Sequence, residues 1–492
     1  MNDNLHIAVV GSGTAGHIAA LYLRTAFPAA QITNISSSKV GIIGVGEGST
    51  EHWREFMDTC NIPVLEMLAM TAATHKYGIR FENWSRQTPD YFHSVSGDEN
   101  LFAFGTYPTY LGFIDRGKLL TTQTTTVGLT QNKIRRVDLH SNTNQFHFDT
   151  FRLNEYFEGL SFSRSIKLID DEVKDISIDS ETGNIVSVKI SSGEDIAADF
   201  WIDATGFARV LMTKLGNTEW VSFSDYLLCD SAIAFPTESD PSGEIRPYTR
   251  ARAATSGWMW EIPTQERRGN GYVFSSNHIS ADEAFAEASD MTGYKPDKFR
   301  HFSFDPGYLK KQWVNNCVAV GLASSFVEPL EATSIGSTIQ QVKALIPNIA
   351  SYTSKSSKMQ NFYNRNMEQV MRNILTMIRL HYISDRSDTA FWNDVKGMKI
   401  NDELQELLDL WSERPPTRYD SPENYFCMFQ SAHFIHVAQG QNILNSESAG
   451  RAINRFGIKD AVRKDMFVRN ADRFNHELVD HAQSLREINL YD

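Results

Sequence analysis

The chain has 492 residues, and its 47 Lys and Arg against 60 Asp and Glu give a formal net charge of −13. This acidic balance excludes a surface built to bind nucleic-acid phosphates. The hydrophobic fraction of 41% and the charged fraction of 22% exclude a disordered chain. No apolar run reaches the ~18 residues that a membrane-spanning helix needs.

The first residues do not have the composition of a secretory signal. Met1-Asn2-Asp3-Asn4 carries an acid where a basic segment is expected, and glycines soon interrupt the apolar stretch that follows. The four Cys, at positions 60, 229, 317 and 427, lack the C-x-x-C spacing of zinc and redox sites. We therefore expect reduced thiols, no bound metal and a cytoplasmic protein.

The first predicted unit is a strand, a glycine turn and a helix. Residues 6–16 read His-Ile-Ala-Val-Val-Gly-Ser-Gly-Thr-Ala-Gly, and residues 17–26 have the Ala and Leu content of a helix. This pattern predicts a dinucleotide-binding GxGxxG turn, with a glycine turn in another α/β fold as the alternative. We assign a tight turn to Gly11, close approach to a pyrophosphate to Gly13, and close helix packing to Gly16.

The second predicted strand, residues 31–36, is not followed by the acid that usually binds the ribose of the cofactor. That acid is expected about 20 residues after the glycine turn, but the strand ends in Ser36-Ser37-Ser38. We therefore expect weaker cofactor binding than usual, or a ribose that is held from elsewhere in the protein.

A second nucleotide-binding strand is expected far along the chain. Residues 196–206 read Ile-Ala-Ala-Asp-Phe-Trp-Ile-Asp-Ala-Thr-Gly, an apolar strand that ends in Asp203 and a turn at Gly206. Alternating apolar and polar residues over 172–195 predict β structure before it. The arrangement resembles that of FAD-dependent enzymes. Because no second GxGxxG follows a strand, we expect electrons from outside or from transient nicotinamide binding.

From about residue 345 onward the spacing of apolar residues becomes helical. Residues 361–383 and 402–411 are typical of it, so a largely helical C-terminal part is predicted. His433 and His436 lie three residues apart on a predicted helix. Because no third ligand is evident, we interpret them as ordinary helix histidines rather than as a metal site.

Two segments have an unusual composition, and we assign a binding role to neither. Residues 121–126 are almost all Thr, which we interpret as a polar strand or loop rather than a binding tract. Residues 133–136, Lys-Ile-Arg-Arg, are a short basic run, which in an acidic protein is typical of a solvated face.

Two tryptophans carry the first specific signal. Residues 257–263 read Gly-Trp-Met-Trp-Glu-Ile-Pro, which places Trp258 and Trp260 on the same face of an extended segment. Taken alone, the pair is more typical of core packing. Together with the residues around it, the segment resembles the flavin-dependent halogenases of the tryptophan halogenase type, whose hallmark is WxWxIP. The resemblance covers nearly all of residues 5 to about 395.

The resemblance implies a catalytic lysine, a catalytic glutamate and a halide site. Lys76, within His-Lys-Tyr-Gly-Ile-Arg-Phe, falls where the family has its essential lysine. Glu331 falls at the essential glutamate, although Glu328 lies only three residues earlier and could exchange roles with it. The backbone amides of Thr333 and Ser334 match the halide cradle of the family.

The same resemblance implies a set of flavin contacts. Residues 44–50, Gly-Val-Gly-Glu-Gly-Ser-Thr, are similar to the strap that the family places between the flavin and the active site. Ser325 stands where the family often has glycine. The implied cofactor-binding residues are Gly11, Gly13, Ala15, Gly16, Gly44, Gly46, Glu47, Asp203, Gly206, Leu322 and Ile335.

These residues suit the chemistry of a halogenase. A buried amine can hold hypohalous acid as a hydrogen-bond donor or as a haloamine, and a carboxylate can stabilise a cationic ring and take its proton. We predict that FADH2 from a separate reductase, dioxygen and chloride, bromide or iodide serve to halogenate an electron-rich aromatic such as an indole or phenol. One alternative is a flavin-dependent aromatic hydroxylase, against which Lys76 and the Trp258 and Trp260 segment argue. Another is a flavoprotein that has lost catalysis, against which Lys76 and Glu331 argue.

The C-terminal region departs from enzymes that act on free tryptophan. The resemblance implies a Tyr-Tyr pair followed by Glu, which residues 424–441 lack, so free tryptophan is not the expected substrate. We expect an α/β fold and a homo-oligomer. The expected parts are an FAD-binding Rossmann-like domain of the flavin monooxygenase type at 1–345, with inserted substrate-side segments at about 52–150 and 215–315, and a helical substrate-side subdomain at 346–492.

Overall fold

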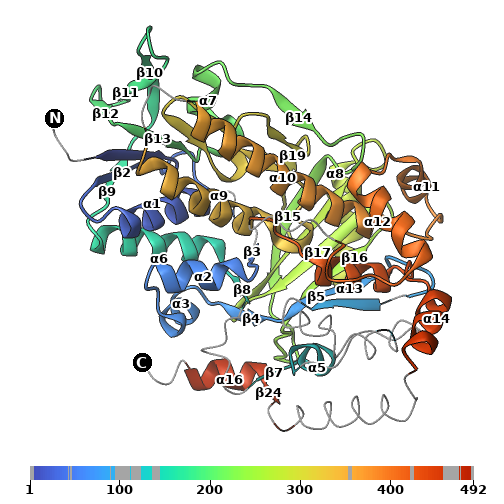
Figure 1. Ribbon diagram of the computed structural model, residues 1–492. Helices are drawn as coiled ribbons and strands as arrows, with labels where there is room; N and C mark the ends of the chain where they lie inside the picture. The colour runs from blue at the N-terminus through green and yellow to red at the C-terminus, as the bar shows by residue number, and fades with distance from the viewer. Residues whose placement is uncertain are drawn as a thin grey trace.

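Two large sheets form the centre of the protein, and helices cover them (Figure 1). This computed structural model describes residues 5–42, 44, 47–88, 90–94, 111, 124–135, 145–352, 357–420, 426–457, 476 and 478–488. The first sheet lies beside α1 (Thr14–Ala26) and α6 (Thr150–Ser163), and the second lies behind α10 (Lys358–His381) in this view.

The first sheet is a parallel nucleotide-binding sheet with one antiparallel edge. Its central strands, at residues 6–10, 31–36 and 200–203, are short and mostly buried, as the apolar sequence of a doubly covered parallel sheet predicts. The predicted strands at 6–10 and 31–36 are confirmed and pair directly, with Ile7 beside Ile32. The strand order is β21 (Trp313–Val314), β22 (Cys317–Ala319), β13 (Phe200–Asp203), β1 (His6–Val10), β2 (Gln31–Ser36) and β9 (Lys167–Asp170).

The second sheet joins two segments that are far apart in the sequence. Five of its seven strands come from residues 231–303, and the other two come from residues 78–94. The two groups meet where β5, residues 78–82, pairs in parallel with β16, residues 249–253. The strand order is β19 (Arg300–Ser303), β15 (Ser231–Glu238), β18 (Arg267–Phe274), β17 (Gly257–Pro263), β16 (Thr249–Ala253), β5 (Gly78–Glu82) and β6 (Asp90–Ser94).

Four smaller sheets complete the β structure of the described residues. The β interpretation of residues 172–195 is confirmed by the antiparallel sheet β10 (Val173–Ile178), β11 (Ile185–Ile190) and β12 (Asp195–Ala197). The other three are β3 (Glu47–Gly48) with β8 (Gln145–Phe148) and β4 (Thr74–Lys76), β14 (Trp220–Ser222) with β20 (Gly307–Leu309) and β23 (Ser325–Phe326), and β24 (Leu478–Asp480) with β7 (Lys133–Arg135).

The helices confirm the predicted change of character after residue 345. Residues 361–383 and 402–411 fall largely in α10 and α12. The remaining helices are α2 (His52–Thr59), α3 (Val64–Met70), α5 (Thr124–Gln131), α7 (Val210–Lys214), α8 (Ala281–Thr292), α9 (Thr333–Ile349), α11 (Ala390–Gly397), α12 (Asp402–Glu413), α13 (Ser431–Gly440), α14 (Ser446–Phe456) and α16 (His481–Ile488).

The threonine-rich segment corrects one prediction. Residues 124–126 begin helix α5 instead of forming a strand or loop, whereas residues 121–123 lie outside the described part of the chain. Threonine is a weak helix former, but α5 packs against β6 and β7, and such tertiary contact overrides a weak propensity. The basic run at 133–135 forms β7, in which Lys133 is exposed, and Arg136 lies outside the described residues.

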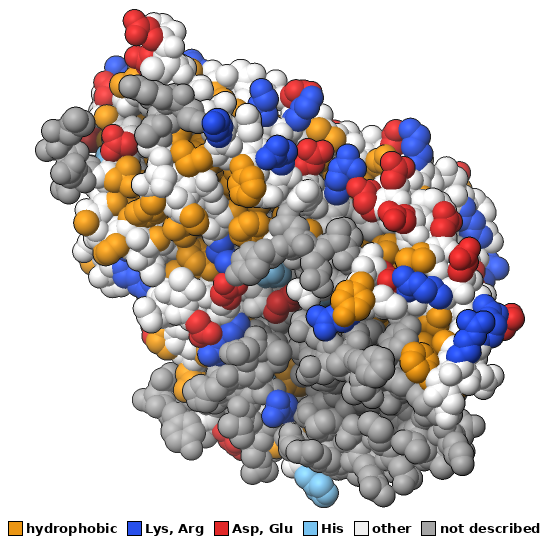
Figure 2. Space-filling model, viewed as in Figure 1, with side chains coloured by type: hydrophobic (Ala, Val, Ile, Leu, Met, Phe, Trp, Pro, Cys, Tyr) orange, Lys and Arg blue, Asp and Glu red, His pale blue; other side chains and the backbone are white. Residues whose placement is uncertain are grey.

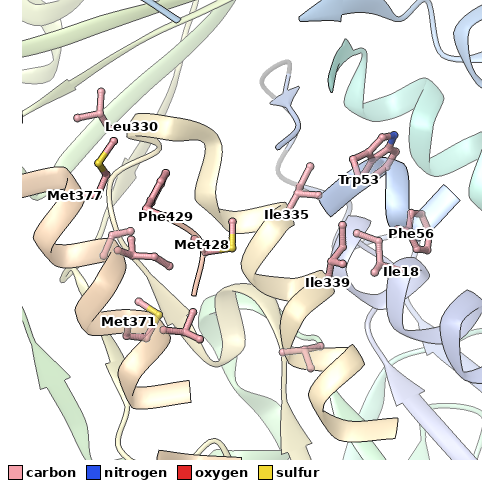
Figure 3. Packing of buried hydrophobic residues seen from close by; sticks show 14 of the residues in the cluster. Ile18, Trp53, Phe56, Leu330, Ile335, Ile339, Met371, Met377, Met428 and Phe429 are labelled. Atoms are coloured by element: carbon pink, nitrogen blue, oxygen red, sulfur yellow. The ribbon is translucent and has the colours of Figure 1, made fainter. Parts of the chain in front are cut away.

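Helix α9 is the centre of the hydrophobic core. Ile335 and Ile339 on α9 face Ile18 of α1 and the α2 side chains Trp53 and Phe56 on one side (Figure 3). Met428, Phe429 and the α10 methionines pack on its other side. The N-terminus of α9 is thereby held rigidly where the two large sheets approach each other.

The surface divides by chemical character. Hydrophobic side chains gather over the region of α1 and α9, and charged side chains of both signs cover α10 and α12 (Figure 2). None of the helices in the described ranges combines the length and the apolar composition that crossing a bilayer requires.

Candidate active site

The glycine turn after β1 has the geometry that the sequence predicts. Gly11 has a φ of +111°, and a Cβ at this position would collide with the carbonyl of Ala204, so only glycine fits. A Cβ on Gly16 would collide with the carbonyl of Gly11, whereas a Cβ on Gly13 would meet nothing. Gly16 therefore allows close packing of α1, and Gly13 leaves open space at its N-terminus, where an anion is favoured.

A cavity of about 790 Å³ opens beside this turn. Trp258 and Trp260 both line it, which confirms that β17 directs them to one side. The buried Nε1–H of Trp260 has no acceptor in the described protein, so it can donate to a bound group. The wall of the cavity also includes these residues singled out from the sequence: Gly11, Gly13, Ala15, Glu47, Gly206, Leu322, Glu331, Thr333, Ser334 and Ile335.

Two acids lie where the missing ribose-binding acid of β2 would be. Asp171 and Glu172 follow β9, the strand next to β2, and both line the cavity together with Ser36. The Asp171 backbone N–H donates to the Ser36 carbonyl at 2.7 Å. Both carboxylates already accept hydrogen bonds from the protein, Asp171 from the backbone N–H groups of Glu172 and Ser192, and Glu172 from Lys174 Nζ. Together, the glycine turn and the free tryptophan donor fit the groups of FAD.

Three of the predicted cofactor residues do not reach the cavity wall, and one cannot be placed. Gly16 lies behind the turn, and Gly44 packs against the ring of Phe151. Asp203 uses both carboxylate oxygens to accept from the backbone N–H groups of Thr205, Leu211 and Met212 and from the Thr205 hydroxyl. Gly46 lies outside the described residues.

Lys76 is a buried amine that lies behind the cavity wall and does not line the cavity. Its side chain on β4 is 1% exposed, and its Nζ donates to the carbonyl of Ser49 at 2.8 Å. Gly48 lines the cavity, and a Cβ on it would lie only 3.4 Å from that Nζ. Burial lowers the pKa of Lys76 to about 8, against the opposing charges of Glu331 and Glu51. The amine therefore changes charge near neutral pH.

Glu331 is a buried carboxylate held by two histidines. It lies in the turn before α9 with a φ of +68°, so the backbone is strained to present it. His93 Nδ1 lies 2.8 Å from both carboxylate oxygens, and His381 Nε2 lies 2.8 Å from Oε1. Burial would raise the pKa of Glu331, but the two histidines hold it well below its ordinary value.

Backbone amides form an anion cradle directly after Glu331. Ala332 is left-handed (φ +55°, ψ +40°) and Thr333 is right-handed (φ −72°, ψ −26°), and such a pair turns successive N–H groups toward one point. Thr333 and Ser334 are also the first residues of α9, where N–H groups have no helical partner. No side chain caps this end of α9, so these amides are available to a halide.

The second acid of the same loop has a different environment. Glu328 Oε2 accepts from Trp258 Nε1 and from the Tyr382 hydroxyl, both at 2.7 Å, and it does not line the cavity. Burial raises the pKa of Glu328 to about 7. Of the two acids, Glu331 is therefore the one that stays charged at acidic and neutral pH and faces the cavity, whereas Glu328 ionises only around pH 7 and anchors the tryptophan strand.

The two C-terminal histidines occupy α13 as predicted. His433 Nδ1 lies 2.9 Å from His93 Nε2, and the rings of His93 and His436 are 5.9 Å apart. Within the described residues, no group of three His, Cys, Asp or Glu side chains is placed to hold a metal ion. His433 therefore belongs to the surroundings of Glu331.

The two histidines that hold Glu331 were not singled out as site residues from the sequence. His381 lies within residues 361–383, whose spacing predicts a helix but no role for this residue. His93 lies in a short strand with no recognisable motif, and only the pairing of β5 and β6 brings it to Glu331.

The fold and the site together define a class of protein. A dinucleotide turn, a flavin-sized cavity, a buried carboxylate in its wall and a buried lysine behind that wall are the parts of an FAD-dependent enzyme that acts on a bound organic substrate.

Comparisons with known proteins agree with this class. The family description "Tryptophan halogenase" matches residues 6–454. The tryptophan 7-halogenase RebH of Lentzea aerocolonigenes is 32% identical over 93% of this chain and 95% of its own length. The tryptophan 6-halogenase SttH of Streptomyces toxytricini is 31% identical over 83% of this chain and 84% of its own.

Solved structures give the same result. The crystal structure of SttH superposes with a TM-score of 0.90 at 27% identity, covering 98% of this chain and 99% of that one. A flavin-dependent halogenase from Xanthomonas campestris superposes with a TM-score of 0.88 at 28% identity, covering 99% and 98%. The chain belongs to the tryptophan halogenase family. It is a flavin-dependent halogenase that uses a halide and FADH2 supplied by a separate flavin reductase.

Proposed function

We propose that Lys76 and Glu331 are the catalytic pair of this halogenase. The observation that carries the proposal is their common position at the wall of the flavin-sized cavity. Glu331 lines the cavity, Lys76 lies just behind Gly48 of its wall, and the two side chains interact electrostatically. Lysines without a special role are mostly exposed to solvent, whereas Lys76 is buried near a buried carboxylate.

The cofactor and the halide would occupy the same cavity. We propose Gly11, Gly13, Ala15, Gly206, Leu322 and Ile335 as direct FAD contacts, with Gly16 and Asp203 shaping the turns and Gly44, Gly46 and Glu47 forming the strap. Thr333 and Ser334 would hold the halide through their backbone amides. When bound, FADH2 reacts with dioxygen and the halide to supply hypohalous acid.

The two charged side chains then have complementary tasks. Lys76 holds the oxidised halogen, because its amine can donate a hydrogen bond to hypohalous acid and keep it from diffusing away. Glu331 faces the ring as the carbon–halogen bond forms, stabilises the cation and takes the ring proton. The departing hydroxide takes a proton to become water, which balances the substitution.

Variants at the two positions test the pair separately. Lys76→Ala should leave the oxidation of FADH2 by dioxygen unchanged while abolishing halogenated product. Glu331→Gln should slow product formation on the order of a hundredfold, the usual cost of losing one charge stabiliser. Lys399→Ala, at an exposed lysine, serves as the control. Unchanged product formation by Lys76→Ala would refute its role, as would loss of flavin oxidation.

The substrate class follows from the C-terminal region. The relatives SttH and RebH are named for tryptophan, but residues 424–441 lack the Tyr-Tyr and Glu pattern of enzymes that act on the free amino acid. We propose an indole or phenol other than free tryptophan. Incubation with a flavin reductase, each halide and a panel of indoles and phenols, followed by mass spectrometry, tests this. Preferred halogenation of free tryptophan would contradict it.

Domain organisation and assembly are further proposals. All seven strands of the second sheet come from the expected insertions at 52–150 and 215–315, which supports the insertions, whereas α9 continues through the proposed division at residue 345. The four cysteines are free thiols, which supports a cytoplasmic location. We also propose a homo-oligomer, which light scattering of the purified protein tests.

A further inference from the structure

We propose that His93 is a positioning residue that keeps Glu331 ionised and aimed at the site, so that Glu331 acts as a fixed negative charge rather than a titrating group. This inference rests on the proposed catalytic role of Glu331. It assigns a role in the reaction to a residue of β6, which acts through the carboxylate in the loop before α9.

The contact between the two side chains is direct and fully buried. His93 Nδ1 is equidistant from the two oxygens of Glu331, at 2.8 Å, so it bridges them. The side chains are 0% and 1% exposed. The shared imidazole N–H fixes the direction in which the carboxylate points, and the bond from His381 Nε2 to Oε1 alone, at 2.8 Å, fixes its rotation.

The neighbouring hydrogen bonds determine which nitrogen carries the proton. An ionised carboxylate only accepts, so His93 must present Nδ1–H to Glu331. Its Nε2 then accepts from the Nδ1–H of His433 at 2.9 Å. On the other side, His381 presents Nε2–H to Glu331, and its Nδ1 accepts from the hydroxyl of Tyr91 at 2.9 Å. The whole chain of bonds is consistent with one state, an anionic Glu331 between neutral histidines.

Burial supports the same state. It lowers the pKa of His93 despite the nearby carboxylate, and it lowers the pKa of His433 to about 4. The charged and titratable groups that interact with Glu331 are Lys76 on β4, Tyr91 and His93 on β6, His381 on α10 and His433 on α13. Glu51 before α2 and His436 on α13 interact with His93 and His433.

The consequence is a specific effect on pH dependence. A carboxylate buried without donors prefers to be protonated. If His93 supplies one of the two donors, its loss should allow Glu331 to take up a proton at mildly acidic pH. The ring cation would then meet a neutral group instead of a charge.

The test compares two substitutions with different chemistry. His93→Phe removes the donor, whereas the side-chain amide of His93→Asn can place an N–H near the position of Nδ1. Single-turnover halogenation of indole with bromide and chemically reduced FAD is measured from pH 5 to pH 8. His278→Asn, at a histidine that contacts Asp394 instead, is the control.

The expected result is an acid limb in His93→Phe only. Its rate should fall by about tenfold per pH unit once Glu331 is protonated, while the profiles of the wild type, His93→Asn and His278→Asn share the shape set by other groups. An unchanged profile in His93→Phe would overturn the inference, as would an acid limb of equal size in His93→Asn.

A second measurement needs neither substrate nor a His93 variant. The infrared difference spectrum between the wild type and Glu331→Gln should contain no band of a protonated carboxyl at pH 5, and such a band would overturn the inference. Full activity of Glu331→Gln is a separate outcome, because it would refute the proposed function itself.

Discussion

The buried acid Glu328 makes the stability of this enzyme depend on pH in a way that one substitution can isolate. Its side chain is 1% exposed, and its Oε1 has no partner among the described residues. Burial raises its pKa from 4.5 to about 7. Glu328→Gln keeps an acceptor for Trp258 and Tyr382 but cannot ionise.

The magnitude follows from linkage. A rise from 4.5 to about 7 is worth about 3 kcal/mol at 1.36 kcal/mol per pH unit. Because the folded state binds this proton more tightly than the unfolded state, the stabilisation is complete below pH 4.5 and is lost as the pH rises through about 7. About 2 kcal/mol of it disappears between pH 5.5 and 8.5.

The assay is thermal unfolding of the wild type and the variant at those two pH values. With an unfolding entropy of about 1 kcal/mol/K for a chain of this length, the wild type should lose about 2 °C of Tm more than Glu328→Gln. Comparing the pH differences cancels any constant effect of the amide. Glu158→Gln, at an exposed position, should behave as the wild type. Equal losses in the wild type and Glu328→Gln would refute the reasoning.

Two further predictions concern the cofactor and the lysine. Because the pKa of Lys76 is about 8, its protonated form outnumbers the neutral form by about tenfold at pH 7. If the ammonium holds hypohalous acid, single-turnover halogenation should decline above about pH 8, and a rate that rises through this range would favour a haloamine. Ser36→Glu should tighten FAD, measured by quenching of flavin fluorescence. Retention of stoichiometric FAD by the wild type through gel filtration and dialysis would contradict the weak binding inferred from Ser36.

Local patterns in the sequence were sufficient for the parts of the site that are built from one segment. The glycine turn at Gly11, the strand pair at 6–10 and 31–36, and the shared face of Trp258 and Trp260 depend on backbone sterics and strand alternation. These forces act within a few residues, so the pattern alone predicts them. The same holds for the helical spacing of α10 and α12.

Other features depended on contacts that no local pattern encodes. Residues 124–126 are helical as part of α5, a helix that packs on β6 and β7. Asp203 is the last residue of a predicted nucleotide-binding strand, but its carboxylate accepts hydrogen bonds from the backbone N–H groups of residues that follow it. The acids at the ribose end of the cavity come from the neighbouring strand rather than from β2.

The sequence by itself determined that this chain has a dinucleotide-binding turn, a tryptophan strand and the lysine and glutamate of a flavin-dependent halogenase. Only the tertiary structure decided which of the two acids ionises more readily. Glu328 and Glu331 are three residues apart and chemically identical, yet one accepts from a tryptophan and a tyrosine and the other from two histidines. The charge of a buried carboxyl is determined by the donors around it, and those donors come from strands and helices distant in the sequence.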